Sequence, residues 1–144
     1  MTYETPRAER SEPQRIVRVS AMVVSDEQGR ALVVRKAGAS VFQQPGGKPD
    51  PGETALETGL RELEEETGVV VDPVNVEALG TFTDTAANEP GHSVIAQAFA
   101  VKVHGVEAVA SAEIAELRWV REHEVADTPL APLSRNQLIR FAWR

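Results

Sequence analysis

The chain contains 144 residues, of which 42% are hydrophobic and 26% are charged, and these values predict one globular domain with one hydrophobic core. The formal net charge is −7, so the chain lacks the basic surplus with which proteins usually bind nucleic-acid polymers. A small polyanion remains compatible with this charge if metal ions supply the positive charge.

Cysteine is absent, which excludes disulfide bonds and cysteine-bound zinc and suits a reducing compartment, so we expect a cytoplasmic protein. No apolar run approaches the roughly 20 residues that a membrane helix needs. The first residues, MTYETPRAERSEPQR, lack the apolar core of a signal peptide. We therefore predict a mobile segment over residues 1–14, a folded domain over residues 15–144 and no membrane association.

Two strands open the predicted domain. RIVRVSAMVVSD (15–26) and ALVVRK (31–36) are rich in valine and other β-favouring residues, and EQGR (27–30) between them has the composition of a turn. Together these segments predict a β-hairpin. Residues 37–53 are rich in glycine and proline, which predicts a loop region.

A helix with well-marked ends is predicted over residues 55–67. Thr54 and Glu57 have the spacing of a capping box, and Gly68 stands where a left-handed residue commonly ends a helix. After it, residues 74–86, 93–103 and 113–120 read as strands.

A C-terminal helix is predicted over residues 133–144, where apolar side chains recur at loosely helical spacing. Strands on both sides of a central helix, with a second helix at the end, predict a mixed α/β sandwich.

The central helix carries RELEEETG (61–68), in which glutamates are crowded although like charges repel. At 100° per residue, Glu62, Glu65 and Glu66 fall within an arc of about 100°. The apolar stripe of the helix lies elsewhere and consists of Leu56, Leu60, Leu63 and Thr67. One face of the helix is thus a compact cluster of three carboxylates.

Small residues lie one turn before this cluster, and Gly59 among them costs about 1 kcal/mol relative to alanine inside a helix. We interpret the small residues as allowing a close approach of the Gly46–Gly47 segment. A backbone carbonyl beside three carboxylates would form an all-oxygen pocket suited to Mg²⁺ or Mn²⁺. The alternative is an acidic helix face that is simply solvated.

The run GKPDPGETALETGLRELEEETGV, residues 47–69, resembles the Nudix box, Gly-x5-Glu-x7-Arg-Glu-U-x-Glu-Glu-x-Gly-U, where U is a bulky aliphatic residue. The surrounding strands and the closing ELRWV are similar to the Nudix domain as well, so the resemblance covers about residues 15–144. All nine specified positions of the box agree, namely Gly47, Glu53, Arg61, Glu62, Leu63, Glu65, Glu66, Gly68 and Val69.

The resemblance implies an α/β/α sandwich with a central mixed β-sheet, and Mg²⁺-dependent hydrolysis of a nucleoside diphosphate linked to another group. It also implies that the metal ligands are Glu62, Glu65, Glu66 and the carbonyl of Gly47. Mn²⁺ is an alternative ion. Glu62 is our preferred general base, and a glutamate from a distant loop is the alternative.

Three further roles follow from the same resemblance. Arg61 would orient the carboxylates, and Glu53 would support the loop and helix through an ion pair with Arg61. Relatives also take a metal ligand from the acidic segment before a late strand, where SAEIAELRWV offers Glu113 and Glu116. We prefer Glu116, and a surface glutamate on an edge strand is the alternative.

The loop QQPGGK is similar to that of MutT-type members, which hydrolyse nucleoside triphosphates, including oxidised guanine nucleotides. This implies that Lys48 reaches a phosphate, that Phe42 stacks on a base, and that Gln44, with Gln43, bonds a base or sugar. Asn136 in RNQLIRF is placed like an asparagine that reads a purine. The alternatives are a solvated lysine, a core phenylalanine, solvent-facing glutamines and a helix-surface asparagine.

We therefore predict a Mg²⁺-dependent (d)NTP pyrophosphohydrolase acting on a small-molecule nucleotide. Hydrolysis of nucleotide sugars or of other nucleoside diphosphate derivatives is one alternative, and a non-catalytic nucleotide-sensing module is another. The intact box favours an enzyme. A homodimer with contacts from Phe141 and Trp143 is left open beside the packing of these aromatics into the core. His92, His104 and His123 show no metal-binding spacing.

Overall fold

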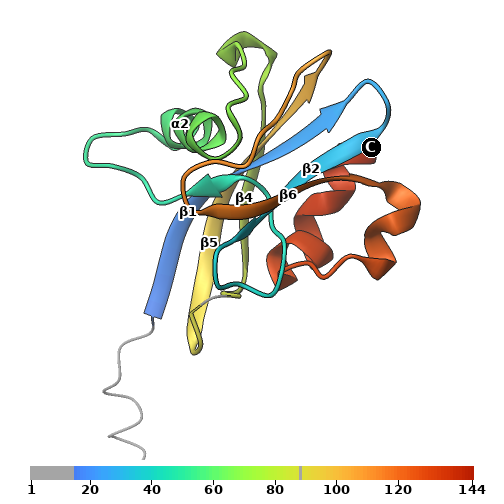
Figure 1. Ribbon diagram of the computed structural model, residues 1–144. Coiled ribbons are helices and arrows are strands. Elements are labelled where there is room, and N and C mark those ends of the chain that lie inside the picture. Colours follow the sequence, from blue (N-terminus) through green and yellow to red (C-terminus); the bar gives the residue numbers. More distant parts are fainter. Residues whose placement is uncertain (1–14, 88) are drawn as a thin grey trace, which may run out of the picture.

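The computed structural model describes residues 15–87 and 89–144, so the predicted mobile segment 1–14 lies outside the described residues (Figure 1). A mixed six-stranded sheet forms its centre, in the order β4–β5–β1–β2–β6, with β3 paired to β1 beside this path. The strands are β1 (Arg15–Asp26), β2 (Arg30–Lys36), β3 (Gly46–Gly47), β4 (Glu77–Thr85), β5 (His92–Val103) and β6 (Ile114–Arg121).

Only one neighbouring pair of named strands in this sheet is parallel. β1 and β5 run side by side from the pair Arg15 and His92 to the pair Asp26 and Val103. The pairs β1–β2, β1–β3, β2–β6 and β4–β5 are antiparallel. The predicted hairpin of the first two strands is thus confirmed, and the sheet is mixed as expected.

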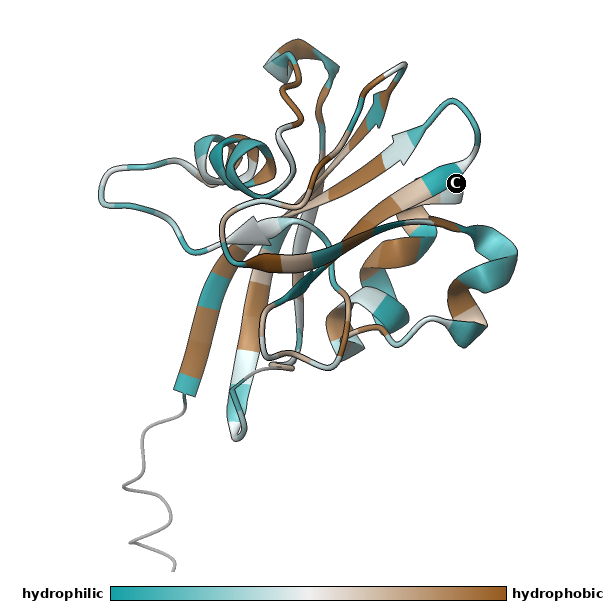
Figure 2. Ribbon diagram, in the orientation of Figure 1, coloured by the Kyte–Doolittle hydropathy of each residue, from teal (hydrophilic) through white to brown (hydrophobic). Residues whose placement is uncertain are grey.

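Helical layers cover both faces of the sheet, which confirms the predicted α/β sandwich (Figure 1). Strand β1 shows why: Met22 and Val24 pack with Leu63 of α2 (Ala55–Thr67), whereas Ala21 and Val23 pack with Leu138 on the opposite face. This alternation is the two-residue period of a strand that is buried on both sides. Hydrophobic residues accordingly follow the central strands (Figure 2).

Helix α2 has the predicted bounds because its caps are present. The Thr54 hydroxyl accepts from the Glu57 N–H at 3.1 Å, and the Glu57 carboxylate accepts from the Thr54 N–H at 2.9 Å. Gly68 follows with φ 76° and donates its N–H to the Glu64 carbonyl. No helix in residues 15–87 and 89–144 is long and apolar enough to cross a membrane.

Gly59 does not serve the role that the sequence suggested for it. A Cβ at this position would lie 2.6 Å from the Met22 sulfur and 3.7 Å from the Ser20 Cβ, so the glycine lets α2 approach strand β1. The close contacts of the Gly46–Gly47 segment involve other residues of β1 and α2, which are described with the site.

Two further differences concern short elements. Strand β3 lies in the region predicted as loop, because two glycines carry no side-chain pattern that indicates a strand. The backbone alone makes the pairing with β1. One of these bonds runs from the Met22 N–H to the Pro45 carbonyl at 2.8 Å. The C-terminal segment is not one regular helix. Three short helical segments follow β6, namely η2 (Glu122–Asp127), η3 (Ser134–Leu138, a π-helical turn) and η4 (Ile139–Trp143). Another short helix, η1 (Pro73–Asn75), precedes β4.

The C-terminal aromatics pack within their own chain. The rings of Phe82 and Phe141 meet edge to face with their centroids 5.7 Å apart. The indole N–H of Trp143 donates to the Gly29 carbonyl at 2.8 Å. Trp143 therefore ties the end of the chain to the turn between β1 and β2, and both aromatics serve the fold whether or not a dimer forms.

Asp26 fixes that same turn and gives a first testable expectation. Its carboxylate accepts from the Gln28 and Arg30 N–H groups at 3.0 and 2.9 Å and from Arg30 Nε at 2.8 Å. Burial opposes the charge, but the bonds from Arg30 and Gln28 outweigh it and lower the pKa from the ordinary 3.8. The stability that Asp26 contributes is therefore full above pH 3.8 and is lost as the pH falls through the lowered pKa.

We expect Asp26→Asn to lower the free energy of unfolding by about 2 kcal/mol at pH 7, because hydrogen bonds to a charged group are weakened. The difference from wild type should shrink as the pH falls below 3.8. Urea unfolding at pH 7 and at a series of acidic pH values measures the free energy of unfolding of both proteins. A difference that grows on acidification would contradict the assignment.

Candidate active site

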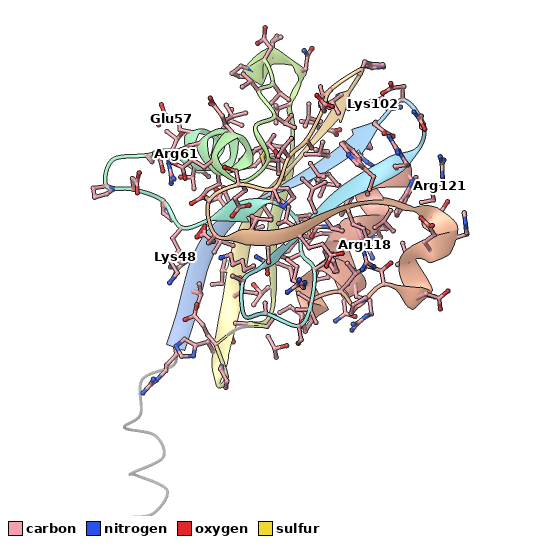
Figure 3. The ribbon with its side chains drawn as sticks, in the orientation of Figure 1. Lys48, Glu57, Arg61, Lys102, Arg118 and Arg121 are labelled. Carbon is pink, nitrogen blue, oxygen red and sulfur yellow. The ribbon has the colours of Figure 1, made fainter. Side chains whose placement is uncertain are left out.

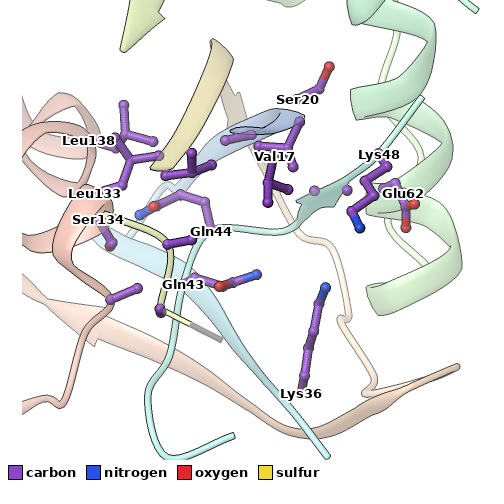
Figure 4. A pocket seen from close by; sticks show the side chains of 18 of the residues that line it. Val17, Ser20, Lys36, Gln43, Gln44, Lys48, Glu62, Leu133, Ser134 and Leu138 are labelled. Carbon is purple, nitrogen blue, oxygen red and sulfur yellow. The ribbon is translucent and has the colours of Figure 1, made fainter. Parts of the chain in front are cut away.

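The glutamate cluster faces a cavity of about 360 Å³ that opens beside α2 (Figure 4). Glu62 and Glu66 of α2 line it together with Gly46 and Gly47 of β3, and Glu113 contributes from the segment before β6. The cavity therefore begins at the predicted box, where strand β3 lies against helix α2.

Arg61 organises the acidic side of this cavity. It projects from α2 toward the loop that follows β3 (Figure 3). Its guanidinium bonds Glu53 Oε2 at 2.5 Å and Glu53 Oε1 at 3.0 Å, and it also bonds the Lys48 carbonyl at 3.1 Å. On its other side it reaches Glu65 at 3.1 Å and Glu62 at 3.3 Å. The predicted Glu53–Arg61 ion pair is present.

Glu53 is held in its charged form by these contacts. The bond from Arg61 is the largest cause, and the Asp50 N–H and the Thr58 hydroxyl donate to the same carboxylate, which lowers the pKa of Glu53 to about 2. Glu53 thus joins the loop to the first turns of α2 and keeps the Arg61 guanidinium in place.

Glu66 is a buried carboxylate with few partners. The residue is 1% exposed, and its Oε1 accepts one bond, from the Gly46 N–H at 3.1 Å. Burial is the main reason that the pKa of Glu66 rises to about 8; Glu62 and Glu113 raise it further, while Gly46 and Lys36 oppose the rise. A charge here needs a cation nearby to offset its desolvation.

Glu62 lies directly against Gly47. A Cβ on Gly47 would stand 2.6 Å from the Glu62 Cδ and would also overlap the carboxylate oxygen Oε2. Burial raises the pKa of Glu62, Arg61 lowers it, and the carboxylates of Glu65 and Glu113 raise it. Gly47 is therefore required because its missing side chain leaves the space that the Glu62 carboxylate occupies.

Glu65 is placed differently from the other two glutamates. Its side chain is 53% exposed and pairs with Arg61. Within the described part of the chain, no three Asp, Glu or His side chains already converge closely enough to form a finished ion site. Glu62, Glu66 and Glu113 thus line one cavity, whereas Glu65 is not among the residues that line it.

The preference for Glu116 over Glu113 does not agree with their positions. Glu116 is paired in register with Arg35 of β2 and bonds the Arg35 and Arg118 guanidinium groups, each at 3.3 Å. Glu113 lines the cavity and acts electrostatically on Glu62 and Glu66. Of the two alternatives, Glu113 rather than the preferred Glu116 lines the cavity with Glu62 and Glu66.

Two predicted substrate residues lie away from the cavity. Phe42 is 1% exposed in the core with Leu130 and Ile139, so its stacking on a base is excluded in this arrangement. The Asn136 amide donates to Asp84 Oδ2 at 3.0 Å and lowers the pKa of that carboxyl. Asn136 is exposed and connects η3 to β4, rather than pointing to a ligand.

The other predicted substrate residues line the cavity. Lys48 stands at its acidic end, with its ammonium 3.8 Å from Glu89 across the opening. Gln43 and Gln44 lie along its floor (Figure 4). Lys36 and Ser134 are among the lining residues that the sequence did not indicate. Neither belongs to a motif: Lys36 ends a strand and Ser134 begins a helical turn, and only the tertiary fold places them here.

The sequence model of the NUDIX domain family matches residues 14–141. The chain therefore belongs to the Nudix family, as the box indicated. It is 35% identical over 105 residues to a Mycobacterium tuberculosis (strain H37Rv) protein named putative 8-oxo-dGTP diphosphatase 3, covering 73% of this chain and 48% of that protein. It is 32% identical over 123 residues to a MutT-like protein of Streptomyces ambofaciens, covering 85% and 74%. The chain thus spans about half the length of the first of these relatives.

Solved structures agree with this assignment. The MutT protein from Methanosarcina mazei Go1 superposes with a TM-score of 0.74 at 25% identity, covering 91% of this chain and 96% of that one. The NUDIX domain of Shewanella oneidensis NrtR, complexed with ADP ribose, gives a TM-score of 0.69 at 22% identity, covering 99% and 97%. These likenesses confirm the predicted fold class.

Proposed function

We propose that this protein is a divalent-metal-dependent hydrolase that cleaves a diphosphate linkage in nucleoside diphosphate derivatives, with nucleoside triphosphates as its substrates. The observation that carries the proposal is the burial of Glu66 beside Glu62 and Glu113, at one end of a cavity whose other end is apolar. Buried carboxylates without a matching cation are costly, so their gathering points to a ligand that brings positive charge.

The donor set fits Mg²⁺ or Mn²⁺. Glu62, Glu66 and Glu113 offer carboxylate oxygens and Gly47 offers a backbone carbonyl, and hard cations prefer such oxygens. Glu65 would join by exchanging its contact with Arg61 for the ion. When bound, the metal neutralises phosphate charge and makes a bound water more acidic.

The residues of the chain supply the remaining parts of the reaction. Water adds to phosphorus while the bridging P–O bond breaks, so a triphosphate gives a monophosphate and pyrophosphate. Glu62 is the proposed base for the water proton, because it lines the cavity and lies against Gly47. Arg61 positions Glu62, and Glu53 positions Arg61.

The cavity also contains groups for the substrate. Lys36 and Lys48 lie at the charged end, where phosphates would sit, and the opposite end is formed by Leu133, Leu138 and Val94. An apolar slot next to a cationic and acidic site suits a nucleotide. The similarity to a putative 8-oxo-dGTP diphosphatase supports triphosphates, including oxidised guanine nucleotides, among the candidates.

Two alternatives remain distinct in chemistry. A nucleotide sugar or another nucleoside diphosphate derivative would need room beyond the phosphates. A sensing module would bind a nucleotide without cleaving it, and a NUDIX domain of this fold has been solved with ADP ribose. The intact set of box glutamates favours hydrolysis over sensing.

A nucleotide panel tests the proposal. Purified protein is incubated with Mg²⁺ and each of several nucleoside triphosphates, nucleotide sugars and ADP-ribose. Chromatography follows the nucleoside monophosphate, which each of these compounds yields when its diphosphate link is cleaved, together with the second product. Pyrophosphate and a nucleoside monophosphate from triphosphates are the expected products. Cleavage of the nucleotide sugars alone would show that they, and not triphosphates, are the substrates. Binding without cleavage of any compound would favour the sensing module.

Glu113 and Glu116 provide a matched comparison within this site. We expect Glu113→Gln to weaken Mn²⁺ binding, measured by calorimetric titration, about tenfold or more, because a carboxylate beside Glu62 and Glu66 is neutralised. Glu116→Gln should leave the affinity unchanged, since that side chain pairs with Arg35 and Arg118. The opposite ranking would restore Glu116 to the metal site.

A further inference from the structure

Two polar groups at the apolar end of the cavity have no hydrogen-bond partner within residues 15–87 and 89–144. Gln44 is 5% exposed and Ser134 is 1% exposed, and both line the cavity. The amide nitrogen Nε2 of Gln44 and the hydroxyl of Ser134 are buried and unpaired. Groups of this kind are rare in folded proteins and cost about 1–3 kcal/mol each, so each one calls for a specific explanation.

Their surroundings indicate the shape of the missing partner. Leu133 and Leu138 lie beside Ser134, and the amide of Gln44 is directed toward this group and away from Glu62 (Figure 4). Lys48 and Glu62 lie at the other end (Figure 4). A flat apolar ligand end with polar atoms at its edge would fill this part of the cavity, which describes a nucleobase.

We propose that Gln44 sets the base preference of the site, with Ser134 as a second contact to the base, and that the site favours purines that carry an oxygen at C6; this inference rests on the proposed function. The unpaired Gln44 atom is a donor and needs an acceptor, which O6 of guanine or hypoxanthine provides. Adenine presents an amino donor at that position. The Ser134 hydroxyl can donate or accept, so it bonds a neighbouring ring nitrogen in either state. Gln44 therefore carries the discrimination, through a small turn of its amide toward the ligand.

The test compares kcat/KM for dGTP, dITP and dATP. Wild type should prefer both 6-oxo substrates over dATP by about tenfold or more, because a buried donor left unpaired rejects the mismatched base. The substrate dITP lacks the 2-amino group of dGTP, so equal preference for these two isolates the 6-oxygen. Oxidised dGTP, which keeps the 6-oxygen, should fall in the preferred group.

Single substitutions assign the effect to residues. Gln44→Leu keeps the size but removes the donor, and it should reduce the ratio of 6-oxo to 6-amino activity to about one. Ser134→Ala should lower kcat/KM for both classes of substrate and leave their ratio nearly unchanged, because the hydroxyl bonds either base. The double variant should add little to the effect of Gln44→Leu on the ratio. Asn136→Ala is the matched control: it lies two residues from Ser134 but bonds Asp84, so the ratio should not change.

Binding of GMP and AMP in EDTA, measured by calorimetry, separates this inference from the proposed hydrolysis. Tighter GMP binding that Gln44→Leu abolishes supports the base readout even if no triphosphate is cleaved. A wild type without base preference, or a Gln44→Leu variant that keeps it, would refute the inference even if triphosphates are hydrolysed. A Gln44→Leu variant that loses stability but keeps the preference would show that the Gln44 amide serves the fold alone.

Discussion

Glu66→Gln is expected to reduce kcat at saturating Mg²⁺ by at least about 100-fold, while the metal-free protein stays as stable as wild type or becomes more stable. Glutamine fits the same space, and its carbonyl oxygen can still accept the Gly46 N–H that Glu66 accepts at 3.1 Å. A bound cation requires the negative charge of Glu66, and the substitution removes this charge. It also removes the cost of burying that charge beside Glu62 and Glu113.

This opposition between activity and stability is the informative part of the result. Thermal unfolding in EDTA at pH 8.5 compares the stability of the variant with that of wild type. At this pH the wild-type Glu66 side chain, with its pKa of about 8, is largely charged. Calorimetric Mn²⁺ titration compares the affinities of the two proteins for the metal ion. Glu64→Gln is the control, because Glu64 is exposed on the same helix and contributes its backbone carbonyl rather than its carboxylate to the cap. A Glu66→Gln enzyme with nearly normal turnover would remove Glu66 from the metal site.

Helix α2 shows what the sequence alone determines well. Its bounds follow from signals within a few residues of each end, namely the Thr54–Glu57 capping box and the left-handed Gly68. The face that carries Glu62 and Glu66 follows from the geometry of one helix. Such features depend on local contacts, and local contacts are encoded by neighbouring residues.

The substrate side could not be predicted at the same level, because it depends on tertiary placement. Whether Glu113 or Glu116 reaches the cluster is decided by the pairing of Glu116 with Arg35 across two strands. In the C-terminal segment, Ser134 lines the cavity and Asn136 bonds Asp84. A shift of two or three residues changes which side chain meets the ligand, and the sequence pattern carries no signal that fixes it.

The two glycines of β3 belong to the local sequence motif but act through tertiary contacts, because each permits a different close approach. Gly46 pairs with Ala21, and a Cβ there would overlap the Ser20 carbonyl oxygen and lie 3.1 Å from the Ala21 Cα. Gly47 instead faces the Glu62 side chain. The first contact is with backbone in the centre of the sheet, which cannot move. The second is with the end of a flexible side chain, which can.

We therefore expect Gly46→Ala and Gly47→Ala to fail in different ways. Gly46→Ala should lower the free energy of unfolding by about 3 kcal/mol, because a methyl group is forced against backbone, and the melting temperature should fall by about 10 °C. Gly47→Ala should change stability by less than about 1 kcal/mol but reduce kcat/KM about 100-fold, since it displaces the Glu62 carboxylate from the cavity.

Thermal unfolding in EDTA measures the stability of both variants, and initial rates on the preferred triphosphate measure their kcat/KM. Adding Glu62→Gln to Gly47→Ala gives the decisive comparison: if alanine acts by displacing Glu62, the double variant is no slower than Glu62→Gln alone. If the two losses multiply, Gly47 serves the reaction by another route, such as its own carbonyl as a metal ligand. Equal destabilisation by both alanines would instead mean that Glu62 is held as rigidly as the strand. In that case the Glu62 carboxylate would have no freedom to adjust to an arriving ion, and any metal bound here would have to take the carboxylate in its present position.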